Sequence, residues 1–188
     1  EEGLHIDKDH FMTISPDEGS MNRAIYLANV LGVDMGMYYK RLDYSRYVNG
    51  RHPIAAYEFL GPKIEGKDMI LIDDMISSGD TIIKIASLLK EKGAGRVYIC
   101  STFGFFTDGL DKFDDAYKKG YFDKLLTTNL VYQSPELLEK PYYISCDMSK
   151  YIALIIDTLN HDTSVSHLLN PVDRIKRCVT NYMSQHEK

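Results

Sequence analysis

Two adjacent carboxylates, Asp73 and Asp74, directly follow the apolar run 70–72 (ILI). Such a run is typical of a buried strand, and in α/β sheets ligands bind at the carboxyl ends of the strands. Neighbouring carboxylates repel each other and are costly to hold there unless a cation or hydroxyl groups contact them. The pair therefore predicts a binding site for Mg²⁺ or for the hydroxyl groups of a ribose.

A short turn of small and polar residues comes next. It contains Ser77, Ser78, Gly79, Asp80 and Thr81, and an amphipathic helix is predicted after it over residues 81–92. Small residues let backbone N–H groups and a helix N-terminus surround a phosphate closely. The same residues would also suit a helix N-cap without any ligand, with Ser78 or Asp80 as the cap. The preceding aspartates favour phosphate binding over a helix cap alone.

Strand-like and helix-like patterns alternate along the whole chain. Strands are predicted at residues 11–15, 33–39, 69–72, 97–102, 124–128 and 142–146, and helices at 21–31, 81–92, 109–119 and 148–160. Residues 40–61 lack a sustained period and are expected to form a long loop or hairpin. The alternation predicts an α/β fold with a mostly parallel sheet flanked by helices. We expect one domain over residues 1–170 and a helical C-terminal extension over 171–188.

Composition and charge exclude several functional classes. The chain has 188 residues, 44% of them hydrophobic and 26% charged, and no run of 18 apolar residues that would span a membrane. The formal net charge is −5 and no dense stripe of Lys and Arg occurs, which argues against nucleic acid as a partner. The three cysteines are far apart, as expected of reduced thiols in the cytoplasm.

Four segments, in the same order along the chain, resemble one known family. The strand, the two aspartates and the turn resemble the phosphoribosyl-binding signature of type I phosphoribosyltransferase folds. The other three segments narrow the resemblance to the C-terminal half of ribose-phosphate pyrophosphokinases: residues 15–19 (SPDEG) with Arg23, the pair Lys40 and Arg41, and residues 163–169 (TSVSHLL). In that family Asp stands in place of Ser77, and Gly in place of Asp80.

The resemblance implies an activity and a role for each site residue. The family transfers pyrophosphate from ATP to ribose 5-phosphate, with Mg²⁺, and forms phosphoribosyl pyrophosphate and AMP. By position, Asp73 and Asp74 would face the ribose hydroxyls and the metal, and residues 77–81 would hold the 5-phosphate. Asp17 would take part in Mg²⁺ binding, and Lys40 and Arg41 would be catalytic. A homo-oligomer and an N-terminal domain absent from this chain are also implied.

Two other functions remain open at this point. The chain could be a true phosphoribosyltransferase, which consumes phosphoribosyl pyrophosphate with a nitrogenous base, although the segment 163–169 argues against it. It could also be a non-catalytic homologue that binds nucleotide or phosphoribosyl ligands and regulates a partner enzyme.

Overall fold

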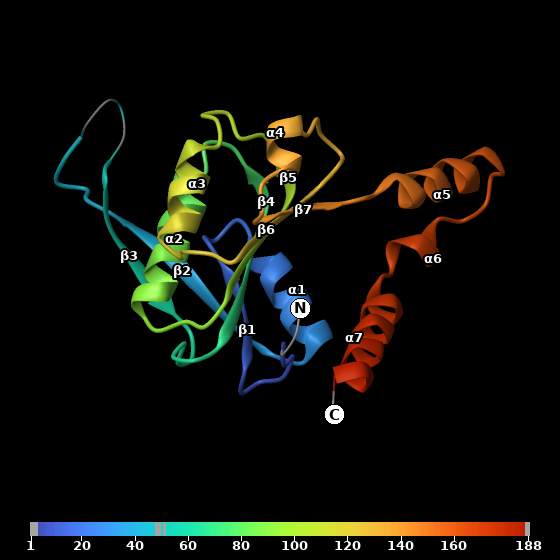
Figure 1. Cartoon of the computed structure of the whole chain (residues 1–188), viewed down its shortest axis with the longest axis horizontal. Helices are drawn as coiled ribbons and strands as arrows, with labels where there is room; N and C mark the ends of the chain where they lie inside the picture. Colours follow the sequence, from blue (N-terminus) through green and yellow to red (C-terminus); the bar gives the residue numbers. More distant parts are fainter. Residues whose placement is uncertain (1–3, 48–49, 51, 187–188) are drawn as a thin grey trace.

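The computed structural model describes residues 4–47, 50 and 52–186 (Figure 1). Strands and helices alternate along most of the chain, as the sequence pattern predicts. The elements are β1 (Phe11–Ser15), α1 (Met21–Leu31), β2 (Asp34–Leu42), β3 (Ile54–Leu60), β4 (Asp68–Ile76), α2 (Asp80–Glu91), β5 (Val97–Gly104), α3 (Asp111–Lys118), β6 (Lys124–Thr128), α4 (Pro135–Leu138), β7 (Tyr143–Cys146), α5 (Ser149–Asn160), α6 (Ser166–Leu169) and α7 (Val172–His186).

The described strands form one seven-stranded sheet in the order β3-β2-β1-β4-β5-β6-β7. Every neighbouring pair is parallel except β2 and β3, which form an antiparallel hairpin. The mostly parallel α/β fold is therefore confirmed. From β1 the chain proceeds to β2 on one side, and β4 joins on the other side of β1, so the strand order reverses between β1 and β4. Such a reversal is where open α/β sheets bind their ligands.

Two apolar clusters hold helices against the sheet. The larger one joins alternate residues of β1, β4 and β5 to α2 and α3, with Leu71, Ile99, Ile85, Leu89 and Phe113 fully buried. The smaller one packs α1 on the opposite face, around Phe11, Ala28 and Tyr98. Because side chains alternate between the two faces of a strand, both faces of the central strands are apolar.

The predicted end of the strand at residues 69–72, which is β4 in the structure, was wrong. The sequence pattern ends the strand at residue 72, but β4 continues to Ile76 because its ladder with β5 persists, pairing Asp73 with Ser101 and Ile76 with Gly104. Strand β2 is also longer than predicted and contains Lys40 and Arg41. The hairpin expected within residues 40–61 is confirmed, whereas the short helix α4 was missed.

The C-terminal elements form an arm beside the sheet. Helix α5 extends away from β7, and the chain then turns back through α6 to α7, which lies against α1 (Figure 1). The Tyr151 hydroxyl donates to the carbonyl of Leu168 at 2.9 Å, and the Leu4 N–H donates to the Tyr182 hydroxyl oxygen at 3.2 Å. The described part of the extension predicted beyond residue 170 is thus largely the helix α7. Across the described residues, no helix has both the length and the apolar character that a membrane crossing requires.

Candidate ribose phosphate site

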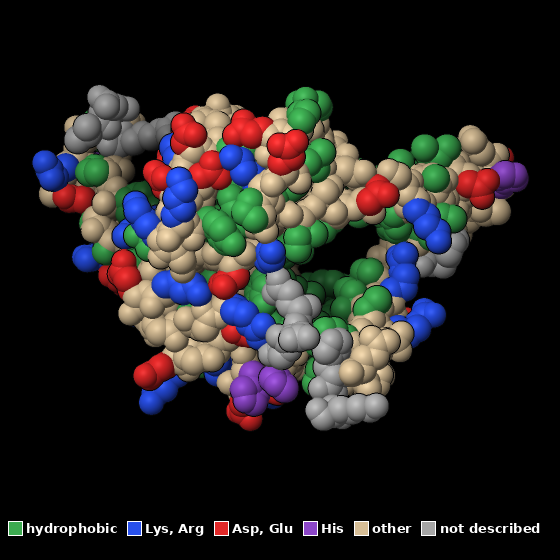
Figure 2. Space-filling model, viewed as in Figure 1, with side chains coloured by type: hydrophobic (Ala, Val, Ile, Leu, Met, Phe, Trp, Pro, Cys, Tyr) green, Lys and Arg blue, Asp and Glu red, His purple; other side chains and the backbone are tan. Residues whose placement is uncertain are grey.

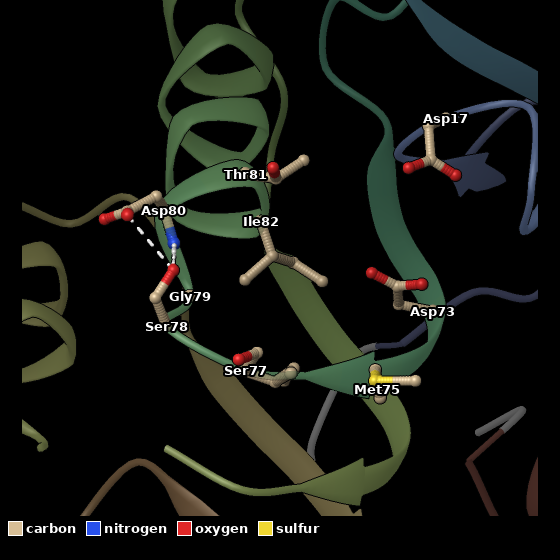
Figure 3. Close-up of a pocket in the computed structure, with 10 residues that line it drawn as sticks. Asp17, Asp73, Met75, Ser77, Ser78, Gly79, Asp80, Thr81 and Ile82 are labelled. Carbon is tan, nitrogen blue, oxygen red and sulfur yellow. Dashed lines mark hydrogen bonds between the residues drawn. The ribbon is translucent and has the colours of Figure 1, made fainter. Parts of the chain in front are cut away.

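A cavity of about 160 Å³ lies at the carboxyl edge of the sheet, where β1 and β4 end. Figure 3 shows Asp17 from the loop after β1 and Asp73 from β4 facing it from one side, with Ser77, Thr81 and Ile82 opposite. The lining residues are Asp17, Asp73, Met75, Ile76, Ser77, Ser78, Gly79, Asp80, Thr81 and Ile82. The structure thus brings most of the predicted substrate-binding residues to one place, at the reversal of strand order.

Asp73 is a half-buried carboxylate that points toward this cavity. Its Oδ1 accepts hydrogen bonds from the Ser20 hydroxyl at 2.7 Å and from the Asp74 N–H at 2.8 Å. Burial raises the pKa of Asp73 above its ordinary value despite these bonds, and the negative charge of Asp17 adds to the effect. Two carboxylates therefore share one cavity without full compensation, which is a place for a cation or for hydroxyl donors.

Asp74 points elsewhere. Because β4 continues past it, successive side chains face opposite sides of the sheet, and Asp74 does not line the cavity. Its Oδ2 accepts from Nη2 of Arg23 in α1 at 3.3 Å. Slight burial opposes ionisation, but a hydrogen bond with Asp73 and the charge of Arg23 hold the pKa of Asp74 below its ordinary value. The two adjacent aspartates are thus in different environments, which their sequence does not distinguish.

The turn from Ser77 to Gly79 leads directly into α2. The Ile83 N–H donates to the carbonyl of Gly79 at 3.0 Å and makes the first hydrogen bond of the helix. The N–H groups that come before Ile83 therefore have no acceptor within the helix. Gly79 is the N-cap residue and has no side chain to cap the helix, while the hydroxyl of Ser78, one residue earlier, accepts a hydrogen bond of 3.4 Å from the Asp80 N–H. The alternative in which Ser78 or Asp80 acts as the N-cap is therefore wrong. The N-terminus of α2 instead adjoins the cavity, where an anion would meet its N–H groups and dipole.

Gly79 is required by the local packing as well as by the turn. Its φ of +86° lies in the left-handed region, and a Cβ at this position would approach Cζ of Phe113 to 2.3 Å. Phe113 belongs to α3 and is completely buried. Helix α3 thus determines how closely the loop Ser77–Gly79 lies against the core.

Asp80 begins α2, and its carboxylate points away from Asp73 and Asp17 (Figure 3). Oδ1 accepts from Nζ of Lys112 at 2.7 Å, and Oδ2 accepts from the Ser78 hydroxyl at 3.0 Å. These two bonds, with that of Lys112 the larger, hold the pKa of Asp80 below its ordinary value.

A second cavity, of about 450 Å³, adjoins the first on the side of β2. It is lined by Asp17, Glu18, Gly19, Tyr39, Lys40, Leu42 and Tyr44. Asp17 borders both cavities and forms an ion pair with Lys40, whose Nζ lies 3.5 Å from Oδ2. Lys40 thus places a cation beside the carboxylate of Asp17, between the two cavities. A cation in such a place can stabilise the negative charge of a phosphate group during its transfer.

Arg41 is not brought to either cavity. Its side chain alternates with that of Lys40 on β2, and Nε donates to Oε1 of Glu58 on the antiparallel strand β3 at 2.8 Å. The structure therefore joins Lys40 to the other predicted site residues and separates Arg41 from them.

Asp17 and Asp73 are the carboxylates of the first cavity that Mg²⁺ would contact. The described residues contain no group of three or more His, Cys, Asp or Glu side chains arranged to hold a metal. Mg²⁺ is typically bound by one or two carboxylates together with substrate phosphates and waters. Asp73 and Asp17 face one cavity, where burial raises the pKa of Asp73 and the negative charge of Asp17 adds to the effect. These two residues would suit a metal that arrives with its phosphate ligand.

Three residues of the site were missed in the sequence. Ser20 donates to Asp73, Phe113 lies behind Gly79, and Lys112 binds Asp80. Ser20 directly follows the segment 15–19, which carries part of the family resemblance, so the sequence did contain a clue to this residue. Phe113 and Lys112 lie more than 30 residues from the loop that they contact, and no local pattern connects them to it.

Several curated relatives of this chain carry the name ribose-phosphate pyrophosphokinase. The chain is 29% identical over 163 residues to ribose-phosphate pyrophosphokinase of Vibrio parahaemolyticus, covering 86% of this chain and 49% of that protein. The Thermococcus kodakarensis enzyme of the same name is 31% identical over 121 residues, covering 64% and 39% of the two chains. The chain thus spans about half the length of the curated relatives that it matches.

A solved structure supports the fold. The crystal structure of phosphoribosylpyrophosphate synthetase from Mycobacterium smegmatis matches with a TM-score of 0.67 and 24% identity, covering 81% of this chain and 45% of that one. The family model of the phosphoribosyl synthetase-associated domain matches residues 51–170. The type I phosphoribosyltransferase fold and the resemblance noted in the sequence are confirmed. This chain belongs to the phosphoribosyl synthetase-associated domain family.

Proposed function

We propose that this chain provides the ribose 5-phosphate-binding part of a ribose-phosphate diphosphokinase in nucleotide biosynthesis. The observation that carries the proposal is the single cavity that joins Asp73, Asp17 and the loop Ser77–Thr81. A helix N-terminus would bind the 5-phosphate while carboxylates accept hydrogen bonds from the ribose hydroxyls. Similarity to enzymes named ribose-phosphate pyrophosphokinase supports this assignment.

In the proposed reaction, the 1-hydroxyl of ribose 5-phosphate attacks the β-phosphorus of ATP. A new oxygen–phosphorus bond forms, the bond to the α-phosphate oxygen breaks, AMP leaves, and the hydroxyl proton is lost to solvent. Bound Mg²⁺ would supply positive charge to the transferring phosphates. Lys40 would contact the diphosphate from the second cavity, and Asp73 would orient the ribose through its hydroxyls.

The assay that tests this function measures AMP released from ATP by the complete gene product with Mg²⁺. Release that depends on ribose 5-phosphate is the expected result. Pyrophosphate release that depends on phosphoribosyl pyrophosphate and a nitrogenous base would show a phosphoribosyltransferase instead. Binding of ribose 5-phosphate without turnover would favour the regulatory homologue.

One observation favours that regulatory alternative as a second candidate. Arg41, which the resemblance makes catalytic, is paired with Glu58 and lies away from both cavities. A chain in which Arg41 stays paired with Glu58 would retain the ribose phosphate cavity but would lack one cation beside the transferring phosphates.

Replacing Lys40 should separate binding from turnover. Lys40→Met removes a cation from the second cavity but leaves Asp73 and the loop Ser77–Thr81 unchanged. We expect turnover to fall by about 100-fold or more, with less than a threefold change in the dissociation constant of ribose 5-phosphate. Calorimetry and the AMP assay measure the two quantities. An equal loss in both would place Lys40 at the ribose phosphate instead.

Mg²⁺-dependent binding should weaken in mildly acidic solution. Because burial raises the pKa of Asp73, this carboxyl becomes protonated at a higher pH than an ordinary aspartate. Metal and hydroxyl donors need the ionised form, so the affinity is lost as the pH falls through the raised pKa. Calorimetry between pH 7 and pH 4 should show this decline and uptake of protons on ligand release. In Asp73→Asn the residual affinity should lack the part of this decline that depends on Asp73 and keep only the part that follows protonation of the 5-phosphate itself, whose second pKa is about 6.

The proposal also includes a homo-oligomer in the cytoplasm and an N-terminal half that completes the ATP site. Two apolar surfaces support further packing. Helix α5 exposes Ile152, Leu154, Ile156 and Leu159, and an apolar cavity of about 260 Å³ lies on the sheet face that bears Ile70, Tyr98 and Ile144. Figure 2 shows hydrophobic side chains gathered in the hollow between the arm and the sheet. Light scattering of the full gene product would give the oligomer order.

A further inference from the structure

Asp80 presents an electrostatic problem for the proposed phosphate site. It is the first residue of α2 and lines the cavity. Its carboxylate therefore lies beside the N–H groups at the start of α2 that an anion would use. A phosphate dianion in the cavity would be repelled by a carboxylate turned toward it. The side chain is 70% exposed, so packing does not hold it in place.

Lys112 holds this carboxylate on the outer side of the loop. Its Nζ lies 2.7 Å from Oδ1 of Asp80 and 2.8 Å from Oδ2 of Asp108, and therefore bridges the start of α2 to the segment before α3. The Ser78 hydroxyl donates to the second oxygen of Asp80. Both carboxylate oxygens are thus engaged away from Asp73 and Asp17 (Figure 3).

Resting on the proposed function, we propose that Lys112 is a positioning residue for phosphate binding, which keeps Asp80 turned out of the cradle of Ser77–Thr81. Lys112 itself does not line the cavity, so its effect on an anion there passes largely through the orientation and charge of Asp80. The chain thereby retains an acidic residue in the first turn of α2 without placing its charge against the phosphate.

Lys112 could also form only an ordinary surface ion pair with Asp80, without any role in phosphate binding. The melting temperature does not separate this case from the positioning role, because exposed pairs contribute little to folding and Lys112→Met should change it only slightly in both cases. Only the positioning role requires that the effect of Lys112 on phosphate binding disappear when Asp80 has no charge. A double-mutant cycle measures this dependence directly.

The test is calorimetry of ribose 5-phosphate with Mg²⁺ on four forms of the full chain: wild type, Lys112→Met, Asp80→Asn and the double variant. We expect Lys112→Met to weaken binding by about three- to tenfold at low ionic strength, since a freed carboxylate then opposes the anion. Asp80→Asn removes the side-chain charge but keeps the backbone N–H groups through which the loop would bind the 5-phosphate, so this variant should bind at least as tightly as wild type. The double variant should match Asp80→Asn within about twofold.

Lys119→Met is the matched control, because Lys119 lies just after α3 and contacts the ring of Tyr121 instead of Asp80. It removes the same charge and should leave the affinity nearly unchanged. Equal losses from Lys112→Met with and without Asp80→Asn would overturn the positioning role and indicate a simple loss of charge, and no loss at all would overturn it too. Absence of ribose 5-phosphate binding by the wild type would instead refute the proposed function and, with it, this role.

Discussion

Asp73→Asn is expected to weaken Mg²⁺-dependent binding of ribose 5-phosphate by about 100-fold or more, because it removes a charged acceptor and a metal ligand together. The amide retains the shape of the side chain and can still accept from the Ser20 hydroxyl. The loss therefore reports the charge at this position and not a change of packing. Calorimetry with and without Mg²⁺ measures it, and without the metal the difference between wild type and variant should be much smaller.

Asp74→Asn is the matched comparison, since it makes the same chemical change one residue along β4. Its carboxylate faces Arg23 and does not line the cavity, so we expect a loss of less than about tenfold. Asp115→Asn, on the exposed surface of α3, should have no effect on affinity. Equal losses at Asp73 and Asp74 would show that Asp74 leaves Arg23 and turns to the ligand.

The stability of Asp73→Asn separates a binding defect from unfolding. A carboxyl whose pKa is raised by folding contributes its stability below the unfolded pKa and loses it as the pH rises through the folded pKa. At pH 7 the ionised Asp73 therefore opposes folding. The melting temperature of Asp73→Asn should be equal to or above that of wild type at pH 7. A lowered melting temperature would indicate a structural role for the charge.

Gly79→Ala should lower the free energy of unfolding by about 2–5 kcal/mol. One part is the left-handed φ of +86°, which disfavours a Cβ by about 1–2 kcal/mol. The other part is overpacking, since the Cβ would lie 2.3 Å from the buried ring of Phe113 and displacing it costs about 1–3 kcal/mol. Chemical denaturation followed by circular dichroism measures the loss.

Gly109→Ala provides the control within the same chain. Gly109 has a φ of +79°, but a Cβ added there would have no atom within 4 Å beyond its chain neighbours. This substitution incurs the conformational cost alone and should destabilise by about 1–2 kcal/mol. If the two alanine variants lost equal stability, the ring of Phe113 would not be constraining the loop Ser77–Gly79.

The overall fold was largely predictable because its determinants are local. Apolar residues recur at helical spacing in α1, α2 and α5, and Gly32 and Gly93 follow two of the helices. The main error concerned the end of β4, because hydrogen bonding to β5 extends a strand past polar residues such as Asp73. Pairing between strands is a non-local interaction that a single segment does not reveal.

The sequence by itself indicated the candidate site's chemical groups. The strand and turn patterns pointed to the two aspartates and to the glycine-containing turn before a helix, because both stand at the end of a predicted strand, whereas Asp17 and Lys40 came from the family resemblance. Only the tertiary structure decided which groups share a cavity. The pleat of β4 turns Asp73 inward and Asp74 toward Arg23, and the pleat of β2 separates Lys40 from Arg41.

Contacts between distant segments decided the remainder of the phosphate site. Phe113 makes Gly79 necessary, and Lys112 turns Asp80 outward, although both residues belong to a helix that follows a different strand. The physical reason is that ring packing and charge pairing depend on distance in space. Separation along the chain does not encode that distance until α2 and α3 lie side by side on one face of the sheet.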